Sequence, residues 1–110
     1  MAADVFSLAE EARLLNSKVF SLSRLQILLA LYDVDGSPFR ELKAALKLSD
    51  GALFSNLQAL GKMGYVTKAT SRVETKDLEV YSLTPNGREA LEKSKAWLAK
   101  WVCKEEGVLK

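Results

Sequence analysis

The side chains that most often carry enzyme chemistry are scarce in this chain. It has no His and a single Cys, Cys103. The usual zinc, haem and Cys–His nucleophile sites need imidazole or several thiols, so the sequence offers none of them. We interpret Cys103 as a small apolar helix residue rather than a redox sensor, because no second Cys is present to resolve it. The composition therefore argues against an enzyme and predicts no metal and no cofactor.

Basic residues gather in the middle of the chain, where they could bind phosphate. The whole chain has 16 basic and 14 acidic residues, and its net charge of +2 says little about partners. Residues 37–76, however, hold seven basic residues against three acidic ones. Such a cluster is typical of a nucleic-acid-binding surface, and an ordinary solvated surface is the alternative. The cations are Arg40, Lys43, Lys47, Lys62, Lys68, Arg72 and Lys76.

Short and polar side chains lie between these cations, over residues 49–62. They would let a helix approach base edges and phosphates closely. Asn56 is the strongest single candidate for reading a base, because its amide can pair bidentately with adenine. The alternative for Asn56 is an ordinary solvated or edge-packed helix residue. The predicted DNA contacts in this stretch are Ser49, Gly51, Ala52, Ser55, Asn56, Ala59 and Lys62.

Two further predicted DNA contacts, Arg72 and Lys76, lie in a polar stretch near the tip of an expected hairpin. Long cationic side chains at such a tip can reach the DNA backbone or the minor groove. Glu74 and Asp77 accompany them and offset part of the attraction to phosphate. We expect Arg72 and Lys76 to contact DNA in spite of these acids.

The elements that must position these residues follow from apolar spacing and turn signals. Leu53, Leu57 and Leu60 recur at helical spacing after Ser49, whose hydroxyl is a good helix cap. Residues 33–38 are rich in turn formers and are expected to form a turn. The sequence predicts helices over 4–15, 21–32, 39–46, 50–63 and 85–106, and strands over 65–70 and 78–83.

This order of elements predicts a mainly α fold with a small β-hairpin, of the winged helix-turn-helix type. Two short helices across a tight turn form a helix-turn-helix, whose second helix can enter the major groove of DNA. The hairpin that follows forms the wing. We expect one domain over residues 1–110, with the helix-turn-helix and wing over 20–84.

Two stretches of the chain resemble a known family. LSDGALFSNLQALGKMGYV, residues 48–66, and VYSLTPNGREALE, residues 80–92, resemble the winged-helix transcriptional regulators of the MarR and ArsR superfamily, in particular its small one-domain archaeal and bacterial members. The resemblance implies a homodimer in which each recognition helix and wing reads half of an approximately palindromic operator. It is compatible with a small-molecule effector, for which no pocket can be named.

The terminal helices, over residues 1–18 and 85–106, are predicted to form the dimer interface. Trp97 and Trp101 lie one helical turn apart and would leave a large apolar patch unless a partner covered them. Packing of the two helices within one chain is the alternative. The expected interface residues are Val5, Leu8, Leu15, Trp97, Leu98 and Trp101.

The sequence therefore predicts a transcriptional regulator that binds double-stranded DNA as a homodimer, through recognition helix 50–63 and wing 65–83. The alternative is a winged helix that binds another protein and lacks sequence-specific DNA binding. An exposed Phe54 would favour the protein partner, and a buried one would favour DNA. The longest apolar stretch, residues 27–32, is too short to span a membrane, and we expect a cytoplasmic protein with no membrane contact.

Overall fold

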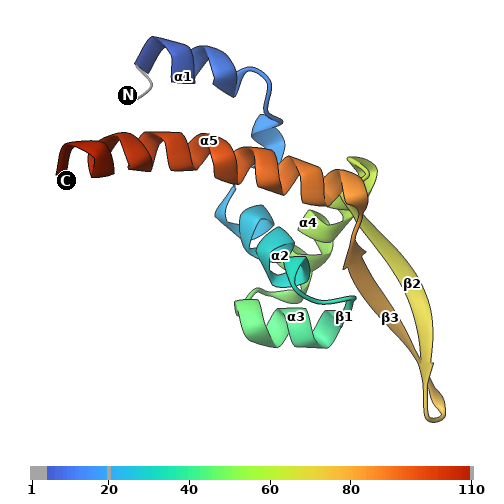
Figure 1. Cartoon of the computed structure of the whole chain (residues 1–110). Helices are drawn as coiled ribbons and strands as arrows, with labels where there is room; N and C mark the ends of the chain where they lie inside the picture. Colours follow the sequence, from blue (N-terminus) through green and yellow to red (C-terminus); the bar gives the residue numbers. More distant parts are fainter. Residues whose placement is uncertain (1–4, 20, 110) are drawn as a thin grey trace.

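A computed structural model describes residues 5–19 and 21–109 (Figure 1). The described part of the chain is mainly helical with a small antiparallel sheet, which confirms the predicted fold class. Its elements are α1 (Val5–Ala12), η1, a turn of 3-10 helix (Ser17–Val19), α2 (Leu22–Tyr32), β1 (Ser37–Pro38), α3 (Phe39–Leu46), α4 (Asp50–Lys62), β2 (Val66–Val73), β3 (Lys76–Leu83) and α5 (Pro85–Leu109).

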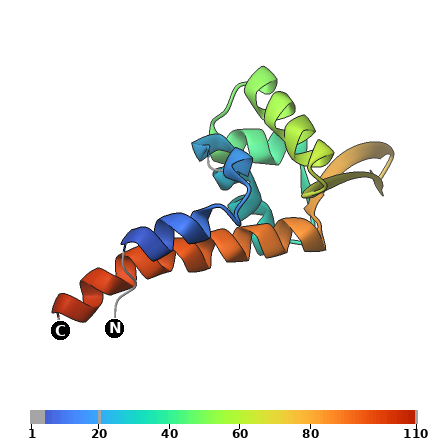
Figure 2. The same ribbon diagram turned by 90° about the horizontal axis from the view of Figure 1, so that it is seen from above.

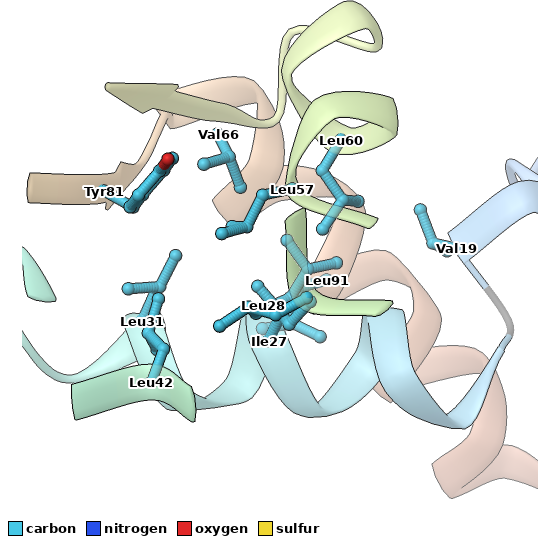
Figure 3. Close-up of a cluster of buried hydrophobic side chains, with 11 residues drawn as sticks. Val19, Ile27, Leu28, Leu31, Leu42, Leu57, Leu60, Val66, Tyr81 and Leu91 are labelled. Atoms are coloured by element: carbon cyan, nitrogen blue, oxygen red, sulfur yellow. The ribbon is translucent and has the colours of Figure 1, made fainter. Parts of the chain in front are cut away.

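Helix α2 lies at the centre of the core. It begins after Ser21, whose hydroxyl oxygen accepts a hydrogen bond from the backbone N–H of Arg24 at 3.1 Å. Ile27, Leu28 and Leu31 are fully buried, because α2 packs against α4 on one side and α5 on the other (Figure 2). Figure 3 shows the buried cluster around them, which also contains Val19, Leu42, Leu53, Leu57, Leu60, Val66, Tyr81 and Leu91.

Helices α3 and α4 are joined by a short turn, residues 47–49. Lys47 adopts a left-handed φ of 56°, and its N–H donates to the carbonyl of Lys43 at 2.8 Å, which ends α3. Ser49 then caps α4, since its hydroxyl oxygen accepts a hydrogen bond from the N–H of Ala52 at 3.1 Å. These two caps form the predicted helix-turn-helix and confirm the predicted start of α4.

The hairpin of β2 and β3 is the wing, and its strands are longer than predicted. Backbone pairing continues to Val73 opposite Lys76, so Glu74 and Thr75 alone form the turn. Glu74 adopts the left-handed φ of 58° that such a tight turn needs. The prediction of an unpaired stretch over residues 71–77 is therefore wrong, because cross-strand pairing outweighs the weak strand preference of polar side chains.

Strand β1 was predicted as part of a turn. Ser37 pairs with Tyr81 and Pro38 pairs with Val80, which places β1 at one edge of a sheet ordered β1-β3-β2. Pro38 has no N–H to donate to a neighbouring strand, and an edge tolerates that loss. The sequence did not predict this two-residue strand, because residues 33–38 are rich in residue types that favour turns.

The wing is tied to α5 at Thr84. The hydroxyl of Thr84 donates to the carbonyl of Gly64 at 2.6 Å and accepts a hydrogen bond from the N–H of Gly87 at 2.9 Å. A Cβ atom at Gly87 would collide with the carbonyl oxygen of Tyr65. The close approach of α5 to the start of the wing therefore requires glycine at this position.

Helices α1 and α5 form an arm that extends from the helix-turn-helix (Figure 2). The indole N–H of Trp97 donates to the carbonyl of Leu8 at 2.8 Å, and Lys100 forms an ion pair with Glu11. Leu8 is fully buried within its own chain, which corrects the expectation that its side chain is available to a second copy. Helix α1 also ends at Ala12, before the predicted end at residue 15.

Helix α5 gives the described chain its elongated shape. It has 25 residues, and the chain extends over 57 × 28 × 24 Å. The helix continues to Leu109, beyond the predicted end at residue 106. Neither α5 nor any other helix in the described ranges is long and apolar enough to cross a membrane.

Candidate nucleic-acid interface

Helix α4 has one buried face and one outward face. Leu53, Leu57 and Leu60 are buried and anchor the helix against α2. The opposite side carries exposed residues that recur about one turn apart and therefore share a face. We call this face the outward stripe, and its members are Gly51, Ser55, Gln58 and Lys62.

The structure brings most of the predicted contacts on α4 to the outward stripe or beside it. Ser49 is exposed at the N-terminal end of the stripe, where its hydroxyl accepts from Ala52 and keeps its own proton for another acceptor. Ala52 and Ala59 are half-buried next to the stripe. Their small side chains leave room for a ligand to approach the helix closely.

Asn56 lies beside the buried face of α4 rather than on the outward stripe. Its side chain is half-buried, and its Oδ1 atom accepts a hydrogen bond from Nε of Arg24 at 3.1 Å. Its Nδ2 atom donates to the carbonyl of Ala52 at 2.8 Å. Both ends of the amide are therefore used within the chain. Each end keeps one further hydrogen-bonding site, but these two bonds hold the amide beside the buried face of α4.

The cations of α3 and the following turn differ in their surroundings. Lys43 forms an ion pair of 2.9 Å with Asp50, the first residue of α4. Arg40 and Lys47 are exposed and form no ion pair within the described ranges. Arg40 and Lys47 are consequently the cations of this region that remain able to meet a phosphate.

The wing carries equal numbers of cations and acids, and two of its cations are paired. Arg72 pairs with Asp77 at 3.1 Å, and Lys68 pairs with Glu79 at 3.1 Å. The hydrogen bond that Lys68 donates to Glu79 raises the pKa of Lys68, which keeps its ammonium charged. The three cations of the wing are Lys68, Arg72 and Lys76, and its three acids are Glu74, Asp77 and Glu79.

An open groove of about 360 Å³ separates α4 from the wing. Phe54 stands at this groove with 51% of its surface exposed, and Gln58 lines it from the next turn of α4. Gln58 was not among the DNA contacts predicted from the sequence. Its position one turn after Phe54 and one turn before Lys62 was the signal that could have identified it.

A helix-turn-helix with a hairpin wing beside its second helix is the architecture of winged-helix DNA-binding domains. Residues 23–102 match the family model described as "Winged helix DNA-binding domain", and the chain belongs to this family. The family is one of DNA-binding domains and not one of enzymes.

Several solved structures share the fold. A proposed transcriptional regulator, ytfH from Salmonella typhimurium, is 30% identical, with 84% of this chain and 81% of that chain covered and a TM-score of 0.64. A transcriptional regulator homologue from Pyrococcus horikoshii OT3 is 23% identical over 90% of this chain and 97% of that one, with a TM-score of 0.71.

The transcriptional regulator Tm0710 from Thermotoga maritima is 19% identical, with 96% of this chain and 74% of that chain covered and a TM-score of 0.73. No curated protein sequence matches this chain. The family match confirms the winged-helix domain that the two sequence stretches predict, and these structures share its fold.

Proposed function

We propose that this protein is a transcriptional regulator that binds double-stranded DNA, with α4 in the major groove and the wing along the adjacent backbone. The observation that carries the proposal is the outward stripe. A helix anchored by buried leucines presents small, polar and cationic groups opposite its buried face. Gly51 and Ser55 would face base edges, and Lys62 would meet a phosphate. Since DNA is the ligand, we expect the protein in the cytoplasm.

The phosphate contacts would come from several elements. Ser49 can donate its hydroxyl proton to a phosphate at the start of α4, and Arg40 and Lys47 can contact the backbone from α3 and the turn. Lys76 would reach the backbone from the tip of the wing. Arg72 would contribute less than the sequence predicts, because Asp77 already neutralises it.

We further propose that two copies associate through their terminal helices. Of the predicted interface residues, Val5 and Leu98 are exposed, whereas Leu15, Trp97 and Trp101 are half-buried. The rings of Trp97 and Trp101 pack edge to face at 5.9 Å, so their role includes stabilising the end of α5. The exposed residues are the ones that would contact the second copy most fully.

Other exposed apolar side chains on α1, in the turn after it, and on α2 and α5 support a dimer. Phe6 and Leu14 are 87% and 80% exposed, and Leu29 and Leu98 line an apolar groove of about 300 Å³ between α2 and α5. A monomer that exposes so much apolar surface would gain free energy by covering it. A small-molecule effector is compatible with the proposal, and no residues are assigned to it.

The exposure of Phe54 favours a second candidate function, a winged helix that binds another protein. An exposed Phe54 was the feature expected of a winged helix that binds a protein, and 51% of the surface of Phe54 is exposed on α4. Aromatic residues are enriched at the centres of protein interfaces. This candidate uses the same face of α4 and therefore competes directly with DNA binding.

Fluorescence anisotropy on a pool of random duplex DNA, measured over a salt series, separates the two candidates. The DNA-binding proposal predicts submicromolar binding at low salt and an affinity that falls steeply as salt rises, because bound cations release counterions. Sedimentation of the same sample would show a dimer. No binding at low salt would reject the regulator and favour the protein-binding module.

A further inference from the structure

We propose that Phe54 and Gln58 together read an A·T-containing step of the DNA site, Gln58 by pairing with adenine and Phe54 by packing on the methyl group of a nearby thymine. This inference rests on the proposed DNA-binding function. It assigns base recognition to Phe54 and Gln58, which were not among the DNA contacts predicted from the sequence. Asn56 is then no longer the residue expected to read a base.

Gln58 has the side chain best suited to read a base from the outward stripe. Its amide oxygen accepts and its NH2 group donates, which matches the N6 and N7 atoms of adenine. Ser55 has a single hydroxyl, and Lys62 can only donate. Gln58 is exposed, and no hydrogen bond holds its amide within the described ranges. The amide is therefore ready to pair without breaking an existing bond.

Asn56 has the same amide chemistry but not the same freedom. Its oxygen is held by Arg24 at 3.1 Å and its NH2 group by the carbonyl of Ala52 at 2.8 Å. A bidentate base contact would require the amide to turn away from these partners toward the outward stripe, which would exchange two bonds for two others with little net gain. Asn56 therefore links α4 to α2, and Gln58 is the residue of α4 that we expect to pair with adenine.

Phe54 lies one helical turn before Gln58, so the two side chains are neighbours on α4. Both line the groove beside the wing, together with Lys62. The thymine methyl is the apolar feature of the major groove, and a half-exposed Phe ring can cover it. Four residues of helix rise about 6 Å, so the two bases would lie within about two base pairs of each other.

The surroundings of this pair favour DNA over a protein partner. Lys62 follows Gln58 by one turn and lines the same groove, so the aromatic ring, the amide and a cation follow one another along the helix. A cation at the edge of a base-reading surface is suited to a backbone phosphate. A purely apolar partner surface would leave both Gln58 and Lys62 desolvated and unpaired.

The test uses a duplex selected from a random pool by the wild-type protein. Each adenine in turn is replaced by 7-deazaadenine, which removes N7, and each thymine by deoxyuridine, which removes the methyl group. We expect one 7-deazaadenine position to weaken wild-type binding about fivefold. We expect a deoxyuridine within about two base pairs of it to weaken binding about fourfold. Gln58→Ala should lose the first sensitivity only, and Phe54→Ala the second only.

Asn56→Ala is the matched control, and it should keep both sensitivities. The pairing of Phe54 and Gln58 with these bases is overturned if both variants respond to the modified duplexes as the wild type does. It is equally overturned if Asn56→Ala is the variant that loses the response to 7-deazaadenine. Failure of the wild-type protein to bind any duplex would instead reject the proposed function itself, so the two failures are distinguishable.

Discussion

Arg24 at the start of α2 and Asn56 in the middle of α4 are joined by a hydrogen bond of 3.1 Å, from Nε of the guanidinium to Oδ1 of the amide. Nη1 of the same guanidinium donates to the carbonyl of Lys18 at 2.7 Å. One side chain thus ties η1, α2 and α4 together. Since Asn56 lies between the buried face and the outward stripe, this bond holds α4 to the start of α2 from the side away from the groove that Phe54 lines.

Removal of this tie should lower stability without removing DNA binding. We expect Arg24→Ala and Asn56→Ala each to lower the free energy of unfolding by about 1 kcal/mol, and the double variant to lose less than the sum. Urea denaturation measures the losses, and anisotropy at low salt should find Asn56→Ala within about threefold of the wild type. Strictly additive losses would show that the bond contributes nothing to stability.

The ion pair between Arg72 and Asp77 predicts that the wing can be made a stronger DNA contact. Asp77→Asn should free the guanidinium and steepen the dependence of log affinity on log salt by up to about 0.9, the contribution of one phosphate contact. Asp33→Asn removes the same charge from an exposed position outside the wing and is the control. Equal slopes for the two variants would exclude Arg72 from the interface.

The proposed dimer predicts that a charge in the groove between α2 and α5 will separate the two copies. Leu98→Asp should sediment as a monomer with unchanged circular dichroism, because Leu98 is 44% exposed and its replacement leaves the core intact. Val34→Asp is a matched control, since Val34 is 45% exposed in the loop after α2. A Leu98→Asp dimer would place the interface elsewhere.

Two glycine substitutions should have opposite effects on stability. Gly87→Ala should lower the free energy of unfolding by about 1–3 kcal/mol, because the added Cβ meets the carbonyl oxygen of Tyr65. Gly51→Ala meets no atom within 4 Å and should raise it by about 0.5–1 kcal/mol, because Ala is the better helix former. Thermal unfolding measures both. A stable Gly87→Ala protein would show that α5 can shift away from the wing.

The helices could be predicted from sequence because their signals are local. The spacing of Leu53, Leu57 and Leu60 marks the buried face of α4, and the hydroxyls of Ser21 and Ser49 cap helices within three residues of themselves. Both kinds of signal depend on neighbours along the chain. The order of the elements then limits the fold to a helix-turn-helix with a wing.

The details of the site depend on partners that are distant in sequence. Asn56 was selected as a base reader because its amide can pair bidentately with adenine, yet Arg24, 32 residues earlier, holds its oxygen. Asp77 was expected to weaken the attraction of the wing to phosphate, but its ion pair with Arg72 depends on the pairing of β2 with β3, which the sequence did not predict that far along the strands. Leu8 looked available because its cover, α5, lies at the other end of the chain.

Reversal of one charge on the outward stripe of α4, and of one charge elsewhere, shows whether DNA binds the stripe. Lys62→Glu and Lys93→Glu change the net charge equally, and Lys93 is exposed on α5, which packs on the side of α2 away from α4 (Figure 2). Anisotropy on random duplex DNA should show at least about tenfold weaker binding for Lys62→Glu, and binding within about twofold of the wild type for Lys93→Glu. Equal losses in both variants, or no loss in Lys62→Glu, would show that DNA does not bind the outward stripe.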